Sequence, residues 1–174
     1  MASSARAAPS LLDRLLPNRL LAAASLVLAL AAIVAVLRGA AEWSRVPALI
    51  WLHLAAVLTA TLLTPVMLLR RKGTRRHRQL GWVWSAAMLA AAAIALFFNA
   101  GHPNGYGVFS GDVSPIHGLS VLVLVAVPLL IARARQHRVT DHERGVRGLV
   151  FGALLIAGWF TFPFDRLLGR WLFG

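Results

Sequence analysis

The stretch VPALIWLHLAAVLTATLLTPVMLL, residues 46–69, decides the fold class because it is an uncharged apolar run of membrane-spanning length. About 20 residues of helix cross the hydrocarbon core of a bilayer. The run is followed at once by RRKGTRRHR, residues 70–78, in which six of nine residues are Arg or Lys. An apolar run that ends in a cluster of positive charge is typical of a membrane helix that enters a cytoplasmic loop.

Further apolar runs predict four more helices, at about residues 20–37, 79–98, 116–132 and 146–163. Hydrophobic residues make up 59% of the chain and charged residues 14%, which is too apolar for an ordinary soluble domain. We therefore expect an all-α, polytopic integral membrane protein with five transmembrane helices, the last four of which form an antiparallel helical bundle. The runs AAASLVLALAA and SAAMLAAAAIA are dense in small residues, which predicts either tight packing within the chain or the face of a homodimer or partner membrane subunit.

The chain divides into three parts on this interpretation. Residues 1–18 are expected to be a cytoplasmic tail, residues 19–164 the transmembrane helical domain, and residues 165–174 an interfacial segment in which Trp171 and Phe173 lie beside arginines. The first apolar run has an alternative interpretation as a signal peptide, because basic residues precede it and small residues follow. It is longer than the 7–15 residues of a signal-peptide core, which favours a retained helix.

The basic residues predict the orientation in the membrane. If the N-terminus is cytoplasmic, fourteen of the 18 Lys and Arg residues lie on the inner side, and only Arg38, Arg45, Arg166 and Arg170 lie outside. This bias predicts a cytoplasmic N-terminus and a C-terminus on the opposite side. The formal charge of +12 is distributed over short connections between apolar runs, so it predicts membrane topology and no nucleic-acid partner. The inner fourteen are Arg6, Arg14, Arg19, Arg70, Arg71, Lys72, Arg75, Arg76, Arg78, Arg133, Arg135, Arg138, Arg144 and Arg147.

Four histidines fall one per helix, at or near the starts of the last four apolar runs. The helix directions sort them into an outer pair, His53 with His117, and an inner pair, His77 with His142. His77 and His142 are expected in the basic loops just ahead of their helices. His53 lies about 25 Å from the inner end of its own helix, so the pairs mark two separate layers. Titratable groups at such depths are costly and usually functional.

Two imidazoles on different helices are a suitable axial pair for haem iron, because a neutral imidazole nitrogen is a good iron ligand. We therefore predict His53, His117, His77 and His142 as cofactor-binding and metal-ligating residues for one or two haem b groups. Glycines near these histidines, such as Gly81, leave room for a porphyrin edge. The basic loops supply partners for the propionates of an inner haem.

Each histidine also has a structural interpretation. His77 and His142 fit solvated residues that begin a helix, and His117 fits an interfacial helix start. His53 fits a hydrogen bond to a threonine or a backbone carbonyl. The remaining two histidines, His102 and His137, are assigned to solvated loops.

Ordered sequence elements resemble a bacterial family of predicted membrane proteins of unknown function. They are WLH at residues 51–53, HRQLG at 77–81, SPIHGLS at 114–120, HERGVRGL at 142–149 and DRLLGRWLFG at 165–174. The resemblance implies a bacterial membrane protein and no established activity. Together with the bias in basic residues, it gives a multi-pass protein of the bacterial inner membrane with a periplasmic C-terminus. More remotely, one histidine on each of four consecutive helices is similar to the transmembrane di-haem cytochromes b reduced by ascorbate. That similarity implies the same pairing, first helix with third and second with fourth.

Other chemistry has little support in the sequence. The six carboxylates lie in tails, loops or helix ends, there is no cysteine, and the HExxH, GxSxG and GxxxxGK[ST] motifs are absent. The sequence thus predicts a b-type cytochrome-like protein that carries electrons across the inner membrane. The alternative is a cofactor-free membrane protein with a structural, assembly or interaction role, whose histidines make interhelical hydrogen bonds. The electron donor, a small molecule or a quinone, is not identified, and whether the protein is an enzyme stays open.

Overall fold

A computed structural model describes residues 16–98, 115–163 and 165–174, and all regular secondary structure in these ranges is helical. The all-α prediction is therefore confirmed for the described chain. The expected tail before residue 16 and residues 99–114, which include His102, lie outside the described residues. The first four long helices are α2 (Asn18–Arg38), α3 (Ala48–Leu69), α4 (Arg75–Ala95) and α5 (Pro115–Arg135), with the 3-10 helix η1 (Ala40–Arg45) between α2 and α3.

The last long helix is built from three consecutive pieces. The α-helix α6 (Val139–Leu149) continues into the π-helix η2 (Val150–Ile156) and the short α-helix α7 (Ala157–Trp159). A π-helix contains one more residue per hydrogen-bonded ring than an α-helix and is frequent at functional sites. A turn then leads to the terminal helix α8 (Leu167–Phe173).

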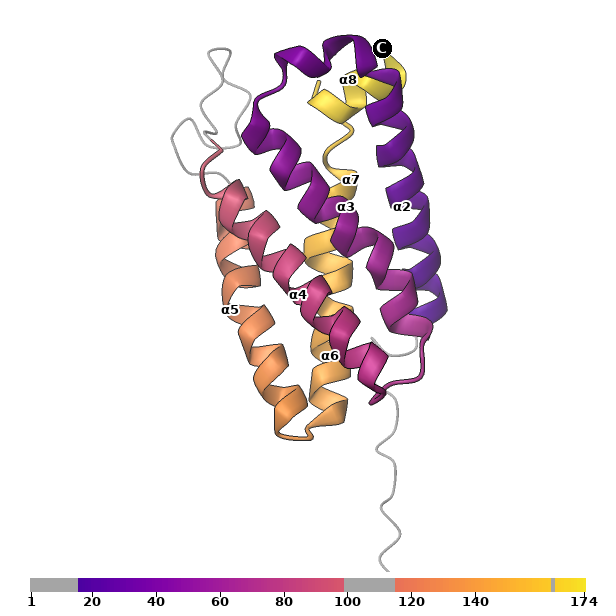
Figure 1. Ribbon diagram of the computed structural model, residues 1–174, viewed down its shortest axis with the longest axis vertical. Helices are drawn as coiled ribbons and strands as arrows, with labels where there is room; N and C mark the ends of the chain where they lie inside the picture. The colour runs from indigo at the N-terminus through magenta and orange to yellow at the C-terminus, as the bar shows by residue number, and fades with distance from the viewer. Residues whose placement is uncertain (1–15, 99–114, 164) are drawn as a thin grey trace, which may run out of the picture.

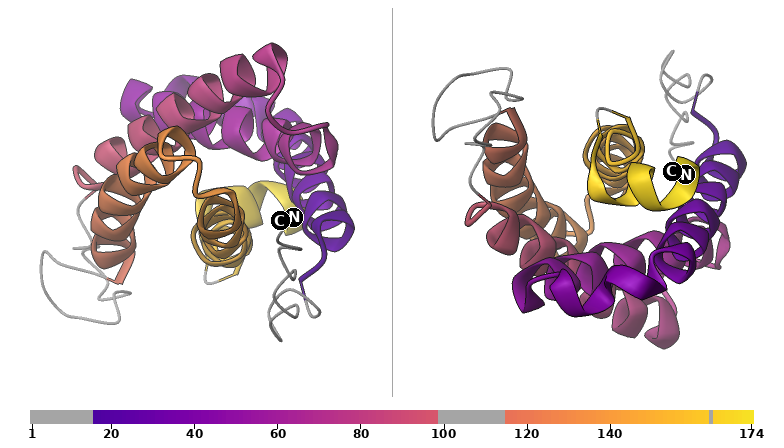
Figure 2. Two further views of the ribbon diagram at one scale, coloured as in Figure 1. Left: turned by 90° about the horizontal axis from the view of Figure 1, so that it is seen from below. Right: turned by 90° about the horizontal axis from the view of Figure 1, so that it is seen from above.

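Helices α2 to α5 form a curved layer, and the last long helix lies on its concave side (Figures 1 and 2). Within the layer α2 packs against α3, α3 against α4, and α4 against α5. The last helix contacts α5 through α6 and α2 through η2, while α8 packs against α2. One end of the molecule therefore gathers the α3–α4 and α5–α6 connections, and the other end holds η1 and α8 (Figure 1).

Three helices, α2, α3 and α5, are long and apolar enough to cross a membrane. Large hydrophobic side chains on these helices face outward, including Leu30 at 53% and Leu52 at 60% exposed. Such a surface is stable in lipid and unfavourable in water. The chain is therefore a membrane protein. Helix α4 begins with a basic turn and α6 carries charged residues along much of its length, which distinguishes these two from the three apolar helices.

The small-residue runs are used for packing inside the chain. Alanines of α2 and α4, among them Ala29, Ala35 and Ala92, are buried, so neighbouring backbones approach closely. The fully buried polar side chains Ser25 and Thr64 donate to backbone carbonyls four residues earlier in their own helices. Within the described ranges, no buried hydroxyl oxygen lacks a hydrogen-bond partner.

Two sequence-based placements are wrong. His77 and His142 lie inside the first turns of α4 and α6, because both helices start several residues before their apolar parts. In the C-terminal segment, α8 packs the Trp171 indole into the fold at 5% exposure. Phe173 of the same helix is 76% exposed and remains available to lipid.

Candidate haem site between the inner histidines

The inner histidines line one cavity of about 390 Å³ at the end of the molecule that holds the α3–α4 and α5–α6 connections. Its floor is buried and mostly apolar, and includes Trp84, Leu130 and Val150. Exposed basic side chains form the rim, among them Lys72 and Arg135. An apolar cavity of this size with a few polar groups directed into it is the usual form of a cofactor site.

His77 is positioned by the N-terminus of α4. Thr74 caps this helix, and its hydroxyl oxygen accepts a hydrogen bond of 3.1 Å from the backbone N–H of His77. The imidazole Nδ1 is buried and has no hydrogen-bond partner among the described residues. His77 therefore carries a buried imidazole nitrogen whose hydrogen bonding is unsatisfied within the described part of the chain.

His142 is oriented by a neighbouring helix. Its Nδ1 lies 3.0 Å from the backbone carbonyl oxygen of Leu130 on α5. A carbonyl only accepts, so Nδ1 carries the proton and donates it, which leaves the lone pair of Nε2 available in the neutral ring. Histidines that bind a metal commonly donate their second N–H to a backbone carbonyl in this manner.

Charged and aromatic side chains surround the mouth of the cavity. Lys72, in the α3–α4 connection, makes an ion pair of 2.6 Å with Glu143 of α6 and thereby ties the two sides of the rim together. The Arg135 guanidinium lies 5.6 Å from the centre of the Trp82 ring, a cation–π contact. Arg78 and Arg147 also line the cavity, so positive charge exceeds negative charge around it.

The floor is rigid because its polar groups are paired. The Trp84 indole N–H donates to the Thr64 hydroxyl oxygen at 3.0 Å, and that hydroxyl donates to the Ala60 carbonyl at 2.8 Å. Both side chains are almost fully buried. The floor therefore gives the cavity a fixed shape and excludes water from it. Its paired polar groups are not available to a ligand.

The outer histidines are in a different environment. His53 Nδ1 donates to the Ala91 carbonyl on α4 at 3.0 Å, and its ring packs edge-on against Phe98 with the centres 5.0 Å apart. Both contacts join α3 to α4. His117 lies half-buried in the first turn of α5. The pairing of His53 with His117 remains a prediction.

The sequence interpretation missed the remaining histidine of the cavity, His137. It lies in the α5–α6 connection with a positive φ of 57° and lines the exposed rim. Lys72 and Glu143 were also missed as partners, because an ion pair between the α3–α4 connection and α6 depends on how the helices meet. Among the described residues, no group of three or more His, Cys, Asp or Glu side chains is placed to hold a bare metal ion.

No protein-family model, curated protein or solved structure matches the chain. The site must therefore be interpreted from its own geometry.

Proposed function

We propose that the chain is a b-type cytochrome-like membrane protein that holds a haem between α4 and α6 and carries electrons through it. One observation carries the proposal. His77 and His142 come from two helices and line the same cavity, one with a buried unpartnered nitrogen and the other with its Nε2 lone pair left available. Two neutral imidazole nitrogens are the donor set of a bis-histidine haem.

The surroundings of the two histidines also suit a haem. A haem joins an apolar macrocycle to two carboxylates, and this cavity joins an apolar floor to a basic rim. Arg78, Arg147 and Arg135 are the residues that would hold the propionates. Two histidines suffice for such a site because the porphyrin itself provides the other iron ligands.

The protein residues have distinct tasks in this proposal. His142 is fixed in one tautomer by Leu130, and His77 is positioned in the first turn of α4 by the Thr74 cap. Trp84 and Val150 exclude water from the floor. When bound, the haem supplies reversible one-electron chemistry at iron, while the protein sets ligand orientation, dielectric and access.

The finer topology belongs to the same proposal. We infer that α4 and the continuous helix α6–η2–α7 cross the membrane beside α2, α3 and α5, giving five crossings in the bacterial inner membrane. The basic connections at the cavity end would be cytoplasmic, and η1 and α8 would be periplasmic. The haem would then lie near the cytoplasmic face, within reach of an electron donor on that side.

A cofactor-free protein with an assembly or interaction role is the second candidate, and the His53 geometry favours it. His53 satisfies Nδ1 at the Ala91 carbonyl, and Phe98 packs against its ring. This hydrogen bond fastens two helices together, and unlike His142 the His53 ring does not line the inner cavity. If all four histidines serve this purpose, the protein is a helical scaffold in the membrane.

A reduced-minus-oxidised absorption spectrum of the detergent-purified protein separates the two candidates. The proposal predicts a Soret band and, after dithionite, an α-band of the b-type. A colourless protein purified from haem-replete cells would contradict it and support the cofactor-free role.

A further inference from the structure

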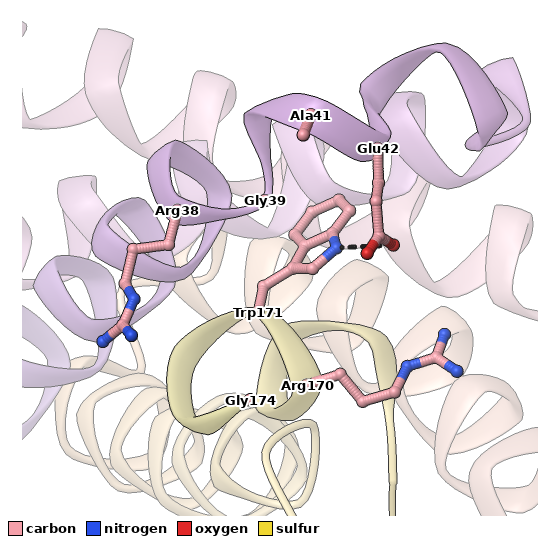
Figure 3. Close-up of a pocket in the computed structure, with 7 residues that line it drawn as sticks. All are labelled: Arg38, Gly39, Ala41, Glu42, Arg170, Trp171 and Gly174. Atoms are coloured by element: carbon pink, nitrogen blue, oxygen red, sulfur yellow. Dashed lines mark hydrogen bonds between the residues drawn. The ribbon is translucent and has the colours of Figure 1, made fainter.

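A second cavity, of about 230 Å³, lies at the opposite end of the molecule, where α2, η1 and α8 meet (Figure 3). Charged residues from all three elements line it: Arg38 from the end of α2, Glu42 from η1 and Arg170 from α8. This cavity shares no lining residue with the proposed haem site. Its combination of two guanidinium groups and one carboxylate indicates a ligand that carries both signs of charge.

The floor of this cavity is built from buried residues. The Trp171 indole lies directly over Gly39, and a Cβ atom added at Gly39 would overlap the indole ring. Both residues are buried, and the indole N–H donates to Oε2 of Glu42 at 3.2 Å. The carboxylate is therefore held over the floor by one oxygen, and its other oxygen remains for a ligand.

The charges of the cavity do not neutralise one another directly. The ion pairs within 4.0 Å among the described residues join Lys72 to Glu143 and Arg138 to Asp141, and neither includes Glu42. Figure 3 shows the Arg38 and Arg170 side chains extending to opposite sides of Trp171, with the Glu42 carboxylate beside the indole nitrogen. Separated opposite charges around one cavity suit the two ends of a zwitterion.

The position of the cavity indicates where that zwitterion comes from. Arg38 ends the apolar helix α2, one of the three candidate membrane spans, so the cavity lies at a membrane surface. Three tryptophans join the elements around it: Trp43 lies 5.6 Å from Trp51, and Trp51 lies 6.2 Å from Trp171, between ring centres. Tryptophan is enriched at the level of lipid headgroups.

We propose that this cavity binds the headgroup of a zwitterionic phospholipid with a primary ammonium group, of the phosphatidylethanolamine type. Glu42 accepts hydrogen bonds from the ammonium group, and the phosphate binds the guanidinium group of Arg38 or of Arg170, which lie on opposite sides of Trp171. A phosphatidylglycerol headgroup has no cation for Glu42. A quaternary choline headgroup has no N–H to donate to the carboxylate. The site should therefore select the primary amine.

Native mass spectrometry tests this selectivity on the full-length protein. The protein is released from mixed micelles that contain equal amounts of phosphatidylethanolamine, phosphatidylglycerol and phosphatidylcholine, and the retained lipids are counted. We expect one phosphatidylethanolamine per chain to be retained in preference to the other two. Equal retention of all three lipids would overturn the proposal.

Two sets of variants test which residues bind the ammonium group and which bind the phosphate. Glu42→Gln keeps an amide oxygen that can accept from Trp171, so the floor stays intact, and it should reduce phosphatidylethanolamine retention about tenfold by removing the charged partner. The double variant Arg38→Gln/Arg170→Gln should reduce retention of phosphatidylethanolamine and phosphatidylglycerol alike. Arg45→Gln, an exposed arginine of η1 outside the cavity lining, is the matched control and should behave like the wild type.

Circular dichroism and visible spectra show whether a change in lipid retention is accompanied by a loss of helix content or of haem. All of these variants should retain the wild-type helix content and the same haem content as the wild type. A correctly folded Glu42→Gln protein that still prefers phosphatidylethanolamine would overturn the assignment of Glu42. Loss of lipid selectivity with unchanged haem would leave the proposed electron-carrier function unaffected.

Discussion

The inner and outer histidine layers have the same pattern in the sequence and different surroundings in the structure. In the inner layer His77 and His142 line a cavity of about 390 Å³, and His77 Nδ1 has no partner among the described residues. In the outer layer His53 makes the same kind of bond to a backbone carbonyl as His142 does, but its ring packs against Phe98 and lines neither of the two cavities described above. Position along a helix therefore does not distinguish a histidine that is available for a ligand from one that fastens two helices.

The physical cause of the difference lies in the neighbouring helices. Ala91 and Ala95 on α4 are small and buried, so α3 approaches closely and a backbone carbonyl of α4 comes within reach of His53. At the inner end, long charged side chains and tryptophans surround the histidines and leave space between the helices. The comparison leads to four predictions, in order of decreasing effect.

The largest effect is expected from removing an inner histidine. His142→Ala and His77→Ala should each abolish the Soret and α-bands of the purified protein, because a bis-histidine haem that loses one axial ligand is held much more weakly. Exogenous imidazole should restore part of the absorbance in His142→Gly, since it can replace the missing ligand. Absorption spectra of the purified variants measure this directly.

His137→Ala is the matched control for the inner histidines. His137 lines the same cavity but is exposed at its rim, so its removal should leave the spectrum unchanged. Retention of wild-type haem by His77→Ala would show that His77 is not a ligand.

The second-largest effect is expected from a substitution that disturbs the packing of Leu130, the residue that orients His142. A Cβ atom at Gly145 would overlap the side chain of Leu130, whose carbonyl accepts from His142, whereas a Cβ at Gly148 would meet open space. Gly145→Ala should lower the free energy of unfolding by about 1–3 kcal/mol and reduce haem content. Gly148→Ala should do neither. Thermal unfolding in detergent, followed by circular dichroism, distinguishes them, and equal behaviour of the two variants would contradict the packing described.

The third effect concerns the outer layer. His53→Ala removes one interhelical hydrogen bond and should lower stability by about 1 kcal/mol, typical of such bonds in membranes. The visible spectrum should not change. A His53→Ala protein that loses about half of its haem would show that the outer histidines also bind haem, as the sequence pattern predicts.

The smallest effect is expected at the rim of the inner cavity. Glu143→Gln breaks the ion pair with Lys72, which is partly exposed on both sides, with side chains 30% and 38% accessible. Solvent screening limits such a pair to about 0.2–1 kcal/mol. The stability difference between Glu143→Gln and wild type should shrink further at high salt, and chemical unfolding at two salt concentrations measures it. A difference that does not respond to salt would mean that Glu143 acts through packing.

Much of the fold could be predicted from the sequence because apolar runs and basic connections have one-dimensional signatures. The all-helical class and the apolar helices α2, α3 and α5 follow directly from runs such as residues 46–69. The start of α4 is harder to predict, because Thr74 caps the helix before its apolar part begins and His77 therefore lies inside the helix. The π-helix within the last helix has no comparable sequence signature.

The candidate site could be predicted only in part. Spacing indicated that His77 and His142 belong to one layer, and the shared cavity agrees with that grouping. Spacing could not show that Leu130 orients His142 or that Trp84 is bonded to Thr64, because both contacts depend on the relative rotation of helices. The burial of Trp171 over Gly39 was missed for the same reason, since residues separated by most of the chain meet there.

The most direct test of the central claim is the haem stoichiometry of the wild-type protein. A pyridine haemochrome assay, combined with a protein determination by amino-acid analysis, gives the number of haem groups per chain. The proposal predicts one haem per chain, held by His77 and His142. A value of zero in protein from haem-replete cells would contradict the electron-carrier function, and a value of two would contradict the distinction drawn between the inner and outer layers.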